Sequence, residues 1–422
     1  MIRRPPRSTQ GVSSAASDVY KRQHPNIGRD PETTASDDTR GGTCADRHAG
    51  RLPISKSLPK RRKGLRTPIT RTDTGVGTPY RMPPSSHGSG EMSESLLQVR
   101  GLKKYFPVRG GVFLRRVGNV HAVEDVSFSV DRGKTLGLVG ESGCGKSTVG
   151  QTILNLHSPT AGNIFYDGRD IATMNRAELK DLRRNVQIIF QDPFESLNAR
   201  HTVSRILEEP FLIHDLGTSA ERRDWAGDLL HRVGLQADAL DRFPHEFSGG
   251  QRQRIGIARA IALKPKLVVC DEAVSALDVS IQSQVINLLM DLQREMNLAL
   301  IFIAHDLAVV KHVSDDVAVM YLGKIVEQAD AKTIYAFPRH PYTKALLSAI
   351  PIPDPSRRGE RIILSGDVPS PIDPPNGCRF HTRCPYTENK CRTLEPTEEL
   401  VNEGHRVACH FWKELADSHP KS

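Results

Sequence analysis

The segment Gly140–Thr148 has the residue types and spacing needed to hold phosphate groups. Its sequence, GESGCGKST, fits the pattern G-x-x-x-x-G-K-[ST] completely. Glycines let the backbone curl until its N–H groups point at phosphate oxygens, while Lys146 reaches the terminal phosphates and Ser147 can ligate Mg²⁺. Cys144 occupies a variable position of the pattern and is interpreted as a small filler. All nine residues are candidate nucleotide ligands: Gly140, Glu141, Ser142, Gly143, Cys144, Gly145, Lys146, Ser147 and Thr148.

An acidic pair follows a second apolar run, Leu267–Cys270. Asp271 is placed to hold Mg²⁺ through water, and Glu272 to polarise an attacking water as a general base. Many strands end in acidic residues, so the pair alone is weak evidence for a catalytic site. Its position about 125 residues after Lys146, at the end of a second strand that can lie beside the phosphate loop, predicts magnesium-dependent hydrolysis of a bound nucleotide.

Four cysteines near the C-terminus are a second group that could bind a ligand. They are separated by 5, 6 and 17 residues: Cys378, Cys384, Cys391 and Cys409. Four thiolates suit a tetrahedral zinc site or an iron–sulfur cluster. The spacing matches neither the short C-x-x-C zinc pairs nor a ferredoxin run. Reduced cysteines without metal, or a disulfide formed on oxidation, are the remaining alternatives, and three histidines could replace a cysteine ligand: His381, His405 and His410.

The elements that must position these residues are short apolar runs alternating with helical patterns. The runs are Ala122–Val130, Thr135–Val139, Asn185–Phe190, Leu267–Cys270 and Ala299–Ala304. Several are too uniformly apolar for half-exposed strands, which indicates a parallel sheet buried on both faces. Strands that alternate with helices predict an α/β fold. The stretch 197–259 has a mainly helical pattern and is interpreted as an inserted helical subdomain.

The segment Phe247–Gln251, with the sequence FSGGQ, indicates which family of nucleotide-binding proteins the chain resembles. Together with the phosphate loop and the acidic pair, it resembles the ATP-binding cassette (ABC) ATPases, whose signature usually reads LSGGQ. Phe247 replaces the leading leucine, which leaves the phosphate-facing residues intact. The resemblance implies a P-loop NTPase with a RecA-like core, an antiparallel β subdomain and an inserted helical subdomain, followed by an irregular C-terminal extension.

The resemblance also implies roles for other residues. Gln191 would sense the γ-phosphate, contribute to the Mg²⁺ site and couple to a membrane partner. His305 would contact the γ-phosphate as the switch histidine. Asp278 would lie across a dimer interface, and Tyr105 would stack on adenine, with Phe106 as a competitor for that role. Residues 107–119 are interpreted as an insertion before the next strand.

In ABC ATPases the signature loop of one subunit covers the phosphate loop of another. The resemblance therefore implies that four residues bind ATP held by a partner: Ser248, Gly249, Gly250 and Gln251. One cassette would contain only half-sites, and a second ABC ATPase subunit, identical or homologous, would be required.

The segments Phe337–Leu347 and Pro374–Pro385 resemble the tail of oligopeptide/dipeptide importer ATPases. The resemblance covers nearly all of residues 95–411. It favours an iron–sulfur cluster, such as a [4Fe-4S] cluster, over zinc at the four cysteines. The expected organisation is a disordered basic segment (1–91), an ABC nucleotide-binding domain (92–330) and the C-terminal extension (331–422).

Charge is unevenly distributed along the chain. The 422 residues carry a formal charge of +9, and residues 1–91 alone hold 17 basic and 8 acidic side chains. The rest of the chain holds 41 of each sign, so bulk charge does not predict nucleic-acid binding. We interpret residues 1–91 as non-native, with Met92 as the natural start, because parts of them resemble translated adapter DNA. No apolar run approaches the ~18 residues of a transmembrane helix.

These observations predict an ATPase, bound at the cytoplasmic face of the membrane, that drives import of dipeptides or oligopeptides with ATP and Mg²⁺. Its expected partners are a second ABC ATPase subunit, two membrane permease subunits and, indirectly, an extracytoplasmic peptide-binding protein. A soluble ABC ATPase acting on ribosomes or nucleic acid is the alternative. A regulatory module without activity is disfavoured because the residues that carry the chemistry are intact.

Overall fold

A mixed sheet forms the centre of the computed structural model, which describes residues 95–110, 115–192, 196–350 and 361–415. Its eight strands lie in the order β11-β12-β10-β9-β3-β8-β7-β6. The parallel strands are β3 (Thr135–Val139), β6 (Val186–Ile189), β7 (Leu267–Asp271), β8 (Ala299–Ala304) and β9 (Asp316–Tyr321). The antiparallel edge consists of β10 (Lys324–Asp330), β11 (Glu399–Asn402) and β12 (His405–Val407).

Alternate residues of the central strands pack into two separate hydrophobic cores. In β7, Val268 and Cys270 face one core, while Leu267 and Val269 face the other. The same alternation runs through β8 and β9. Since successive side chains of a strand point to opposite faces, this division explains why the strands read as continuous apolar runs. The predicted α/β fold with a doubly buried parallel sheet is confirmed.

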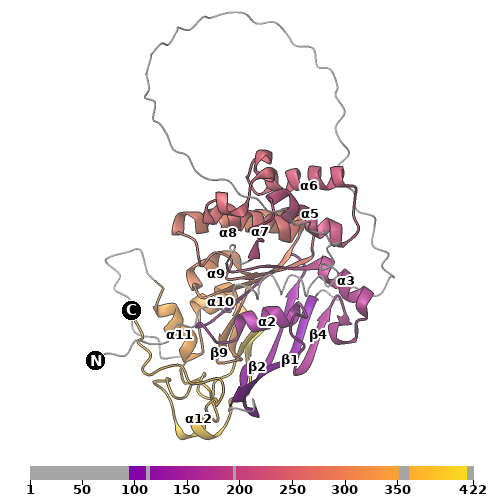
Figure 1. Ribbon diagram of the computed structural model, residues 1–422. Helices are drawn as coiled ribbons and strands as arrows, with labels where there is room; N and C mark the ends of the chain where they lie inside the picture. The colour runs from indigo at the N-terminus through magenta and orange to yellow at the C-terminus, as the bar shows by residue number, and fades with distance from the viewer. Residues whose placement is uncertain (1–94, 111–114, 193–195, 351–360, 416–422) are drawn as a thin grey trace, which may run out of the picture. The chain divides into compact units, whose positions relative to one another are not determined.

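Helices cover one face of this sheet and build the first core (Figure 1). They are α5 (Val203–Ile213), α6 (Ser219–Arg232), α7 (Gly249–Ile261), α8 (Val279–Met296), α9 (Leu307–Val313) and α10 (Ala331–Ala336), with short 3₁₀ turns η2 (Ala237–Asp241) and η3 (Pro244–Glu246). The segment expected to be an inserted helical subdomain, 197–259, contains α5, α6, η2, η3 and most of α7. None of the helices within the described ranges is long and apolar enough to cross a membrane.

The second core lies between the opposite face of the central sheet and a smaller antiparallel sheet. Two helices, α2 (Lys146–Ile153) and α3 (Arg176–Asn185), contribute to it, with the 3₁₀ turn η1 (Ile171–Thr173). The smaller sheet has the strand order β2-β1-β4-β5. Its strands are β1 (Ser95–Gly110), β2 (Arg115–Asp131), β4 (Ala161–Tyr166) and β5 (Arg169–Asp170).

Residues 107–110 and 115–119 of the expected insertion continue two strands, and residues 111–114 lie outside the described ranges. Pro107 pairs with Asn119 and Val108 with Gly118, so β1 and β2 extend together beyond the sheet. Strand β1 loses its other neighbour, β4, after Lys103. Proline lacks a backbone N–H, which is tolerated where a strand has a free side. The segment therefore forms a two-stranded ribbon, and its interpretation as an insertion stays a prediction.

The region after Asp330 contains regular elements as well as irregular stretches. Helices α11 (Pro341–Ser348) and α12 (Asn389–Thr393) belong to it, and β12 adds to the main sheet by pairing with β10. The expected boundary at 330/331 therefore separates segments that share one sheet. The basic segment 1–91 and its expected disorder lie outside the described residues.

Candidate functional site

The phosphate loop, Gly140–Thr148, connects β3 to α2 and follows a backbone path that needs glycine. Gly140 has φ of 152° and Gly145 has φ of 106°. A Cβ at Gly140 would lie 2.1 Å from the Met320 carbonyl oxygen, and one at Gly145 would lie 2.0 Å from that of Ala122. Both contacts are with backbone, which cannot move aside. The glycines thus keep the loop close to the sheet, and its amides at the start of α2 form a cradle suited to phosphate.

Lys146 is held inside this loop by the loop's own carbonyls. Its Nζ donates hydrogen bonds to the oxygens of Gly140 (2.8 Å) and Glu141 (3.1 Å), and the residue is 4% exposed. A phosphate would compete with these carbonyls for the ammonium group. Cys144 is also buried, with its Sγ 3.9 Å from Nζ, and burial raises the pKa of its thiol.

Two of the predicted magnesium ligands lie in contact. Ser147 Oγ at the start of α2 donates a 2.7 Å hydrogen bond to Asp271 Oδ1 at the end of β7. Burial raises the pKa of Asp271, and the bond from Ser147 acts in the opposite direction. Mg²⁺ prefers oxygen ligands and neutralises a buried carboxylate, so this donor pair fits the ion. The third predicted ligand, Gln191, bonds to Glu272 instead.

Glu272 is the centre of a polar group drawn from three neighbouring strands. Gln191 Nε2 donates to Glu272 Oε2 at 3.0 Å, and His305 Nδ1 lies 3.5 Å from the same oxygen. These residues follow β6, β7 and β8, which are adjacent and parallel, so their carboxyl ends meet at one edge of the sheet. The pocket beside them is lined by Glu272, Ser275, Gln282 and His305.

The backbone at Glu272 is unusual for a residue with a side chain. Its φ is 47°, in the left-handed region, and its N–H donates to the Ile303 oxygen at 3.0 Å. Such conformations cost of the order of 1 kcal/mol or more and persist where surrounding contacts impose them. Here the conformation directs the carboxylate toward Gln191 and His305, which is suited to orienting a water and accepting its proton.

The signature residues lie apart from the phosphate loop. Ser248 caps α7: its Oγ accepts from Gln251 N at 3.4 Å, while Gln251 Oε1 accepts from Ser248 N at 3.0 Å. Gly250 is buried at the same helix start, as Ile281 leaves no room for a Cβ. Helix α7 contributes to the first core and α2 to the second, so the two helices lie against opposite faces of the central sheet (Figure 1). Gly249 lies between Ser248 and Gly250 in the same first turn.

Asp278 and Tyr105 have structural partners within the chain. Asp278 caps α8, with Oδ1 accepting from the Ile281 N–H at 3.0 Å, and it is exposed. The Tyr105 ring lies 4.4 Å from the His121 ring, and its hydroxyl donates to Glu124. Their assignments to a dimer interface and to adenine stacking remain predictions.

Glu124 is a buried carboxylate that sequence patterns did not reveal. It forms ion pairs with Lys103 (2.8 Å) and, from the C-terminal region, with Arg379 (3.4 Å), and it contacts His121 and Tyr105. Burial alone would raise the pKa of Glu124, but hydrogen bonds from Lys103, His121 and Tyr105 lower it to about 2. No short motif joins residues that are 255 positions apart in the sequence.

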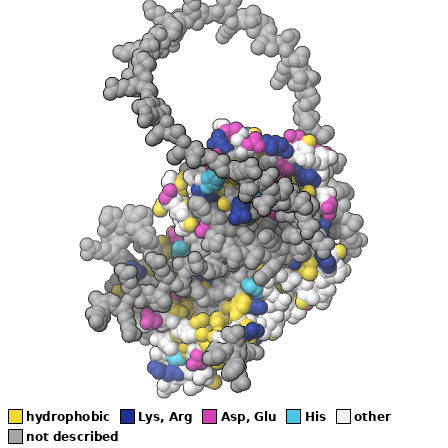
Figure 2. Space-filling view, in the orientation of Figure 1, with side chains coloured by type: hydrophobic (Ala, Val, Ile, Leu, Met, Phe, Trp, Pro, Cys, Tyr) yellow, Lys and Arg dark blue, Asp and Glu magenta, His cyan; other side chains and the backbone are white. Residues whose placement is uncertain are grey.

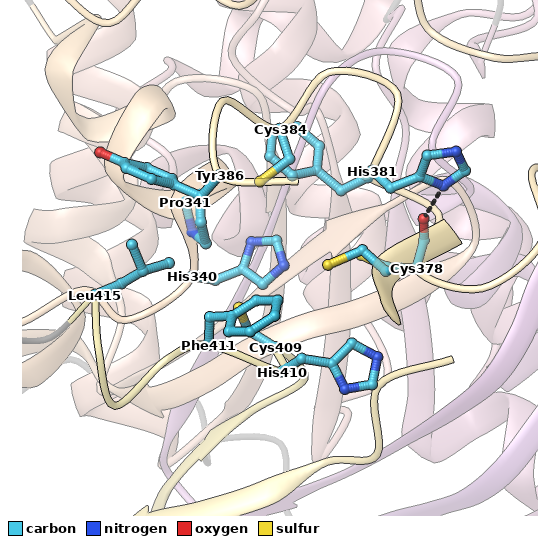
Figure 3. A pocket seen from close by; sticks show the side chains of 12 residues that line it. His340, Pro341, Cys378, His381, Cys384, Tyr386, Cys409, His410, Phe411 and Leu415 are labelled. Atoms are coloured by element: carbon cyan, nitrogen blue, oxygen red, sulfur yellow. Dashed lines mark hydrogen bonds between the residues drawn. The ribbon is translucent and has the colours of Figure 1, made fainter. Parts of the chain in front are cut away.

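The four cysteines of the C-terminal region line one pocket, called here the cysteine pocket (Figure 3). Burial raises the pKa of Cys378 to about 11 and that of Cys409 to about 12. The backbone groups of Phe380, Tyr386 and Phe411 act against burial and lower the pKa of Cys378, Cys384 and Cys409, respectively. Backbone N–H groups near sulfur favour the thiolate, so the donor set is compatible with a thiolate-bound group.

Within the described ranges, no cluster of at least three His, Cys, Asp or Glu side chains is arranged to hold a metal ion. Of the histidines proposed as substitute ligands, His381 and His410 line the cysteine pocket, where they bond to the carbonyls of Cys378 and Leu394. The prediction for His405 was wrong. Its side chain is 1% exposed and pairs with buried Glu327 at 2.9 Å, because β12 joins the sheet beside β10.

Two family models match this chain. The model described as ABC transporter matches residues 123–275, and that described as oligopeptide/dipeptide transporter, C-terminal region, matches residues 326–391. Together they contain the phosphate loop, the acidic pair, the signature residues and three of the four pocket cysteines.

Curated relatives extend the similarity over most of the chain. The oligopeptide transport ATP-binding protein AppF of Bacillus subtilis is 53% identical over 76% of this chain and 98% of its own length. The dipeptide transport ATP-binding protein DppF of Haemophilus influenzae is 50% identical over 74% of this chain and 96% of its own length.

Solved structures show the same fold. The cbiO1 protein of Clostridium perfringens, part of the ABC transporter complex cbiONQ, has a TM-score of 0.50 and 27% identity, covering 58% of this chain and 92% of its own. A dimeric ATP-binding cassette in a post-hydrolysis state with ADP and Pi has a TM-score of 0.50 and 25% identity, covering 56% of this chain and 98% of its own.

Proposed function

Since this chain belongs to the ABC family of transporter ATPases, we propose that it is the ATP-hydrolysing subunit of an importer that takes up dipeptides or oligopeptides. The observation that carries the proposal is the convergence of Gln191 and His305 on Glu272 beside the Ser147–Asp271 pair. The C-terminal region that matches oligopeptide and dipeptide transporters supports peptides as the cargo.

The site residues divide the work of hydrolysis. Mg²⁺, held by Ser147 and Asp271, would neutralise charge on the phosphates. Lys146 exchanges its loop carbonyls for the β- and γ-phosphate oxygens of ATP. Glu272 orients a water in line with the γ-phosphate and takes its proton.

Gln191 and His305 hold the Glu272 carboxylate and can also reach the γ-phosphate. Because both are side chains at strand ends, they can shift when the phosphate leaves. Their contacts with Glu272 support the proposed sensing role of both residues.

A second ATPase subunit completes the site in our proposal. Helices α2 and α7 of one chain lie on opposite faces of the sheet, so the Ser248–Gln251 segment is suited to covering the phosphate loop of a partner. Two membrane permease subunits and an extracytoplasmic peptide-binding protein would form the rest of the importer. The chain would act at the cytoplasmic face of the membrane.

A role on ribosomes or nucleic acid is less well supported than transport. The curated relatives named above are transport proteins. Acidic and basic side chains are interspersed over the helical layer of the described surface in the view of Figure 2, and do not form a field of one sign. Non-specific nucleic-acid binding depends on a concentrated basic surface.

For the cysteine pocket we propose an iron–sulfur cluster as the ligand. Its four thiols line one cavity, and nearby backbone groups lower the pKa of three of them against the effect of burial. Iron and sulfide analysis after anaerobic purification tests this. Stoichiometric zinc without sulfide, or neither metal, would refute the cluster.

Transport is tested by removing the chain from its host and measuring uptake of a labelled dipeptide and a labelled hexapeptide. Uptake should require the intact chain, and the Glu272→Gln variant should not restore it. Glu295→Gln is a matched control, because Glu295 is a carboxylate whose ion pair with Arg232 is exposed to solvent. Affinity purification from detergent-solubilised membranes should also recover permease subunits. Recovery of ribosomal proteins in their place, with peptide uptake unchanged by the loss of the chain, would contradict the proposal.

A further inference from the structure

Glu141, the second residue of the phosphate loop, is held by two residues of the C-terminal region. Arg383 forms two hydrogen bonds with its carboxylate, NH1 to Oε2 at 2.6 Å and NH2 to Oε1 at 3.1 Å. The hydroxyl of Tyr342 accepts a 2.9 Å hydrogen bond from the backbone N–H of Glu141. The loop is thus fixed at both main chain and side chain, by groups about 200 and 242 positions away.

Both holding residues are themselves rigidly supported. The rings of Tyr321, Tyr342 and Phe380 pack against one another in edge-to-face or tilted orientations. The distances between ring centroids are 4.8 Å for Tyr321–Tyr342, 5.1 Å for Tyr321–Phe380 and 5.4 Å for Tyr342–Phe380. All three residues are at most 1% exposed. The Arg383 guanidinium lies 6.0 Å from the Tyr321 ring centroid, and its backbone N–H closes a turn onto the Phe380 oxygen. A planar guanidinium held in this way presents a fixed fork to a carboxylate.

The contact reaches the residue that binds phosphate. The Glu141 carbonyl is one of the two oxygens that accept hydrogen bonds from Lys146 Nζ. Moving Glu141 would therefore move a group that positions Lys146, as well as the start of the amide cradle. The Arg383 side chain is 9% exposed and that of Glu141 28%, so solvent screens their pair only in part.

We propose that Arg383 and Tyr342 are positioning residues of the phosphate loop, which makes the C-terminal region a part of the ATP site. They hold Glu141 so that the loop is preorganised for the phosphates, and their loss weakens nucleotide binding without removing any group that contacts ATP. The inference rests on the ATPase function proposed above, but concerns residues outside the cassette motifs.

The test measures binding of a non-hydrolysable ATP analogue to the full chain, together with KM and kcat for ATP. Arg383→Ala should raise Kd and KM about five- to tenfold, the effect of losing a partly buried bidentate ion pair, with kcat within about twofold. Arg383→Lys should recover part of the loss. Arg406→Ala is the matched control, since Arg406 makes a solvent-exposed pair with Glu398 in the same region.

A double-mutant cycle separates positioning from general destabilisation. In a Glu141→Gln background, adding Arg383→Ala should change Kd by less than twofold, because their ion pair is already lost. Tyr342→Phe keeps the ring and should raise Kd about two- to threefold even if the arginine variant folds poorly. Parent-like Kd values for both Arg383→Ala and Tyr342→Phe would overturn the inference, as would an undiminished arginine effect in the Glu141→Gln background. A parent chain that binds no analogue would instead refute the proposed function.

Discussion

The nucleotide site and the cysteine pocket differ in the charge state of the groups that would bind a ligand. The nucleotide site consists of the phosphate loop and Glu272. In the nucleotide site, polar groups are charged or strongly polar and bond to each other: Lys146 to loop carbonyls and Ser147 to Asp271. In the cysteine pocket, burial raises the pKa of Cys378 and Cys409, which keeps the thiols neutral. In the nucleotide site, a ligand replaces internal hydrogen bonds. In the cysteine pocket, the thiols must release protons before they can bind a metal.

The difference follows from the surroundings of each site. The nucleotide site is built at the carboxyl ends of parallel strands, where the N-terminal ends of helices supply partial positive charge. The cysteine pocket is built from turns and short elements, lined by aromatic and aliphatic side chains such as Phe380, Phe411 and Leu415. Charge is stabilised in the first environment and disfavoured in the second.

We expect the largest effect from replacing Glu272 in the nucleotide site. Glu272→Gln should lower kcat for ATP by about 10²- to 10⁴-fold, because an amide cannot accept the proton of the attacking water. Affinity for ATP should stay within a few-fold of the parent, measured by titration with a fluorescent ATP analogue. Glu295→Gln should leave both quantities unchanged. Turnover by Glu272→Gln at the parent rate would remove Glu272 from the mechanism.

The reactivity of the thiols tests whether the cysteine pocket keeps them neutral. Alkylation of Cys378 and Cys409 by iodoacetamide at pH 8 should be at least about a hundredfold slower in the folded chain than in urea, because raised pKa values of about 11 and 12 leave little thiolate. Mass spectrometry of quenched samples measures each site. The rate should increase as pH rises toward 11. Equal rates in folded and unfolded chains would show that the pocket does not keep these thiols neutral.

Phe380 belongs to both regions, since it lines the cysteine pocket and packs on Tyr321 and Tyr342 near the phosphate loop. Phe380→Ala should lower the free energy of unfolding by about 3–5 kcal/mol, as expected when a fully buried aromatic ring is removed. Urea denaturation measures the change. Tyr386→Ala removes a 45% exposed ring of the same region and should cost about 0.5 kcal/mol or less. Similar losses in the two variants would contradict the shared core.

Glu124, in β2, pairs with Arg379 of the C-terminal region, and its replacement should produce the smallest of these effects. Its pKa is about 2 in the folded chain, below the ordinary 4.5, so its contribution to stability is present above pH 4.5 and is lost as pH falls toward 2. Glu124→Gln should lower stability at pH 7 by at most about 3 kcal/mol. It should also flatten the fall in stability between pH 4.5 and 2, followed by urea denaturation at each pH. An unchanged pH dependence would refute the assigned pKa.

Sequence patterns predicted most of the candidate nucleotide site because its residues are local. The nine residues of the phosphate loop, the Asp271–Glu272 pair and the signature each occupy a few consecutive positions, and each follows a strand or starts a helix. The strands that carry Gln191, Glu272 and His305 were also readable as apolar runs, and parallel order brings their ends together. The pairing of β1 with β2 beyond Lys103 could not be predicted from the sequence, because it depends on backbone hydrogen bonds and not on side-chain pattern.

The sequence by itself determined the chemistry that each short motif can perform and the α/β fold that holds the motifs. Hydrophobic periodicity and the requirement for glycine are local properties, so they are visible in the chain order. Only the tertiary structure decided that Arg383 and Tyr342 hold Glu141, that Arg379 reaches Glu124, and that His405 pairs with Glu327 instead of facing the cysteines. These contacts join residues 78 to 255 positions apart. No local pattern encodes them, because the packing of distant elements sets which side chains meet.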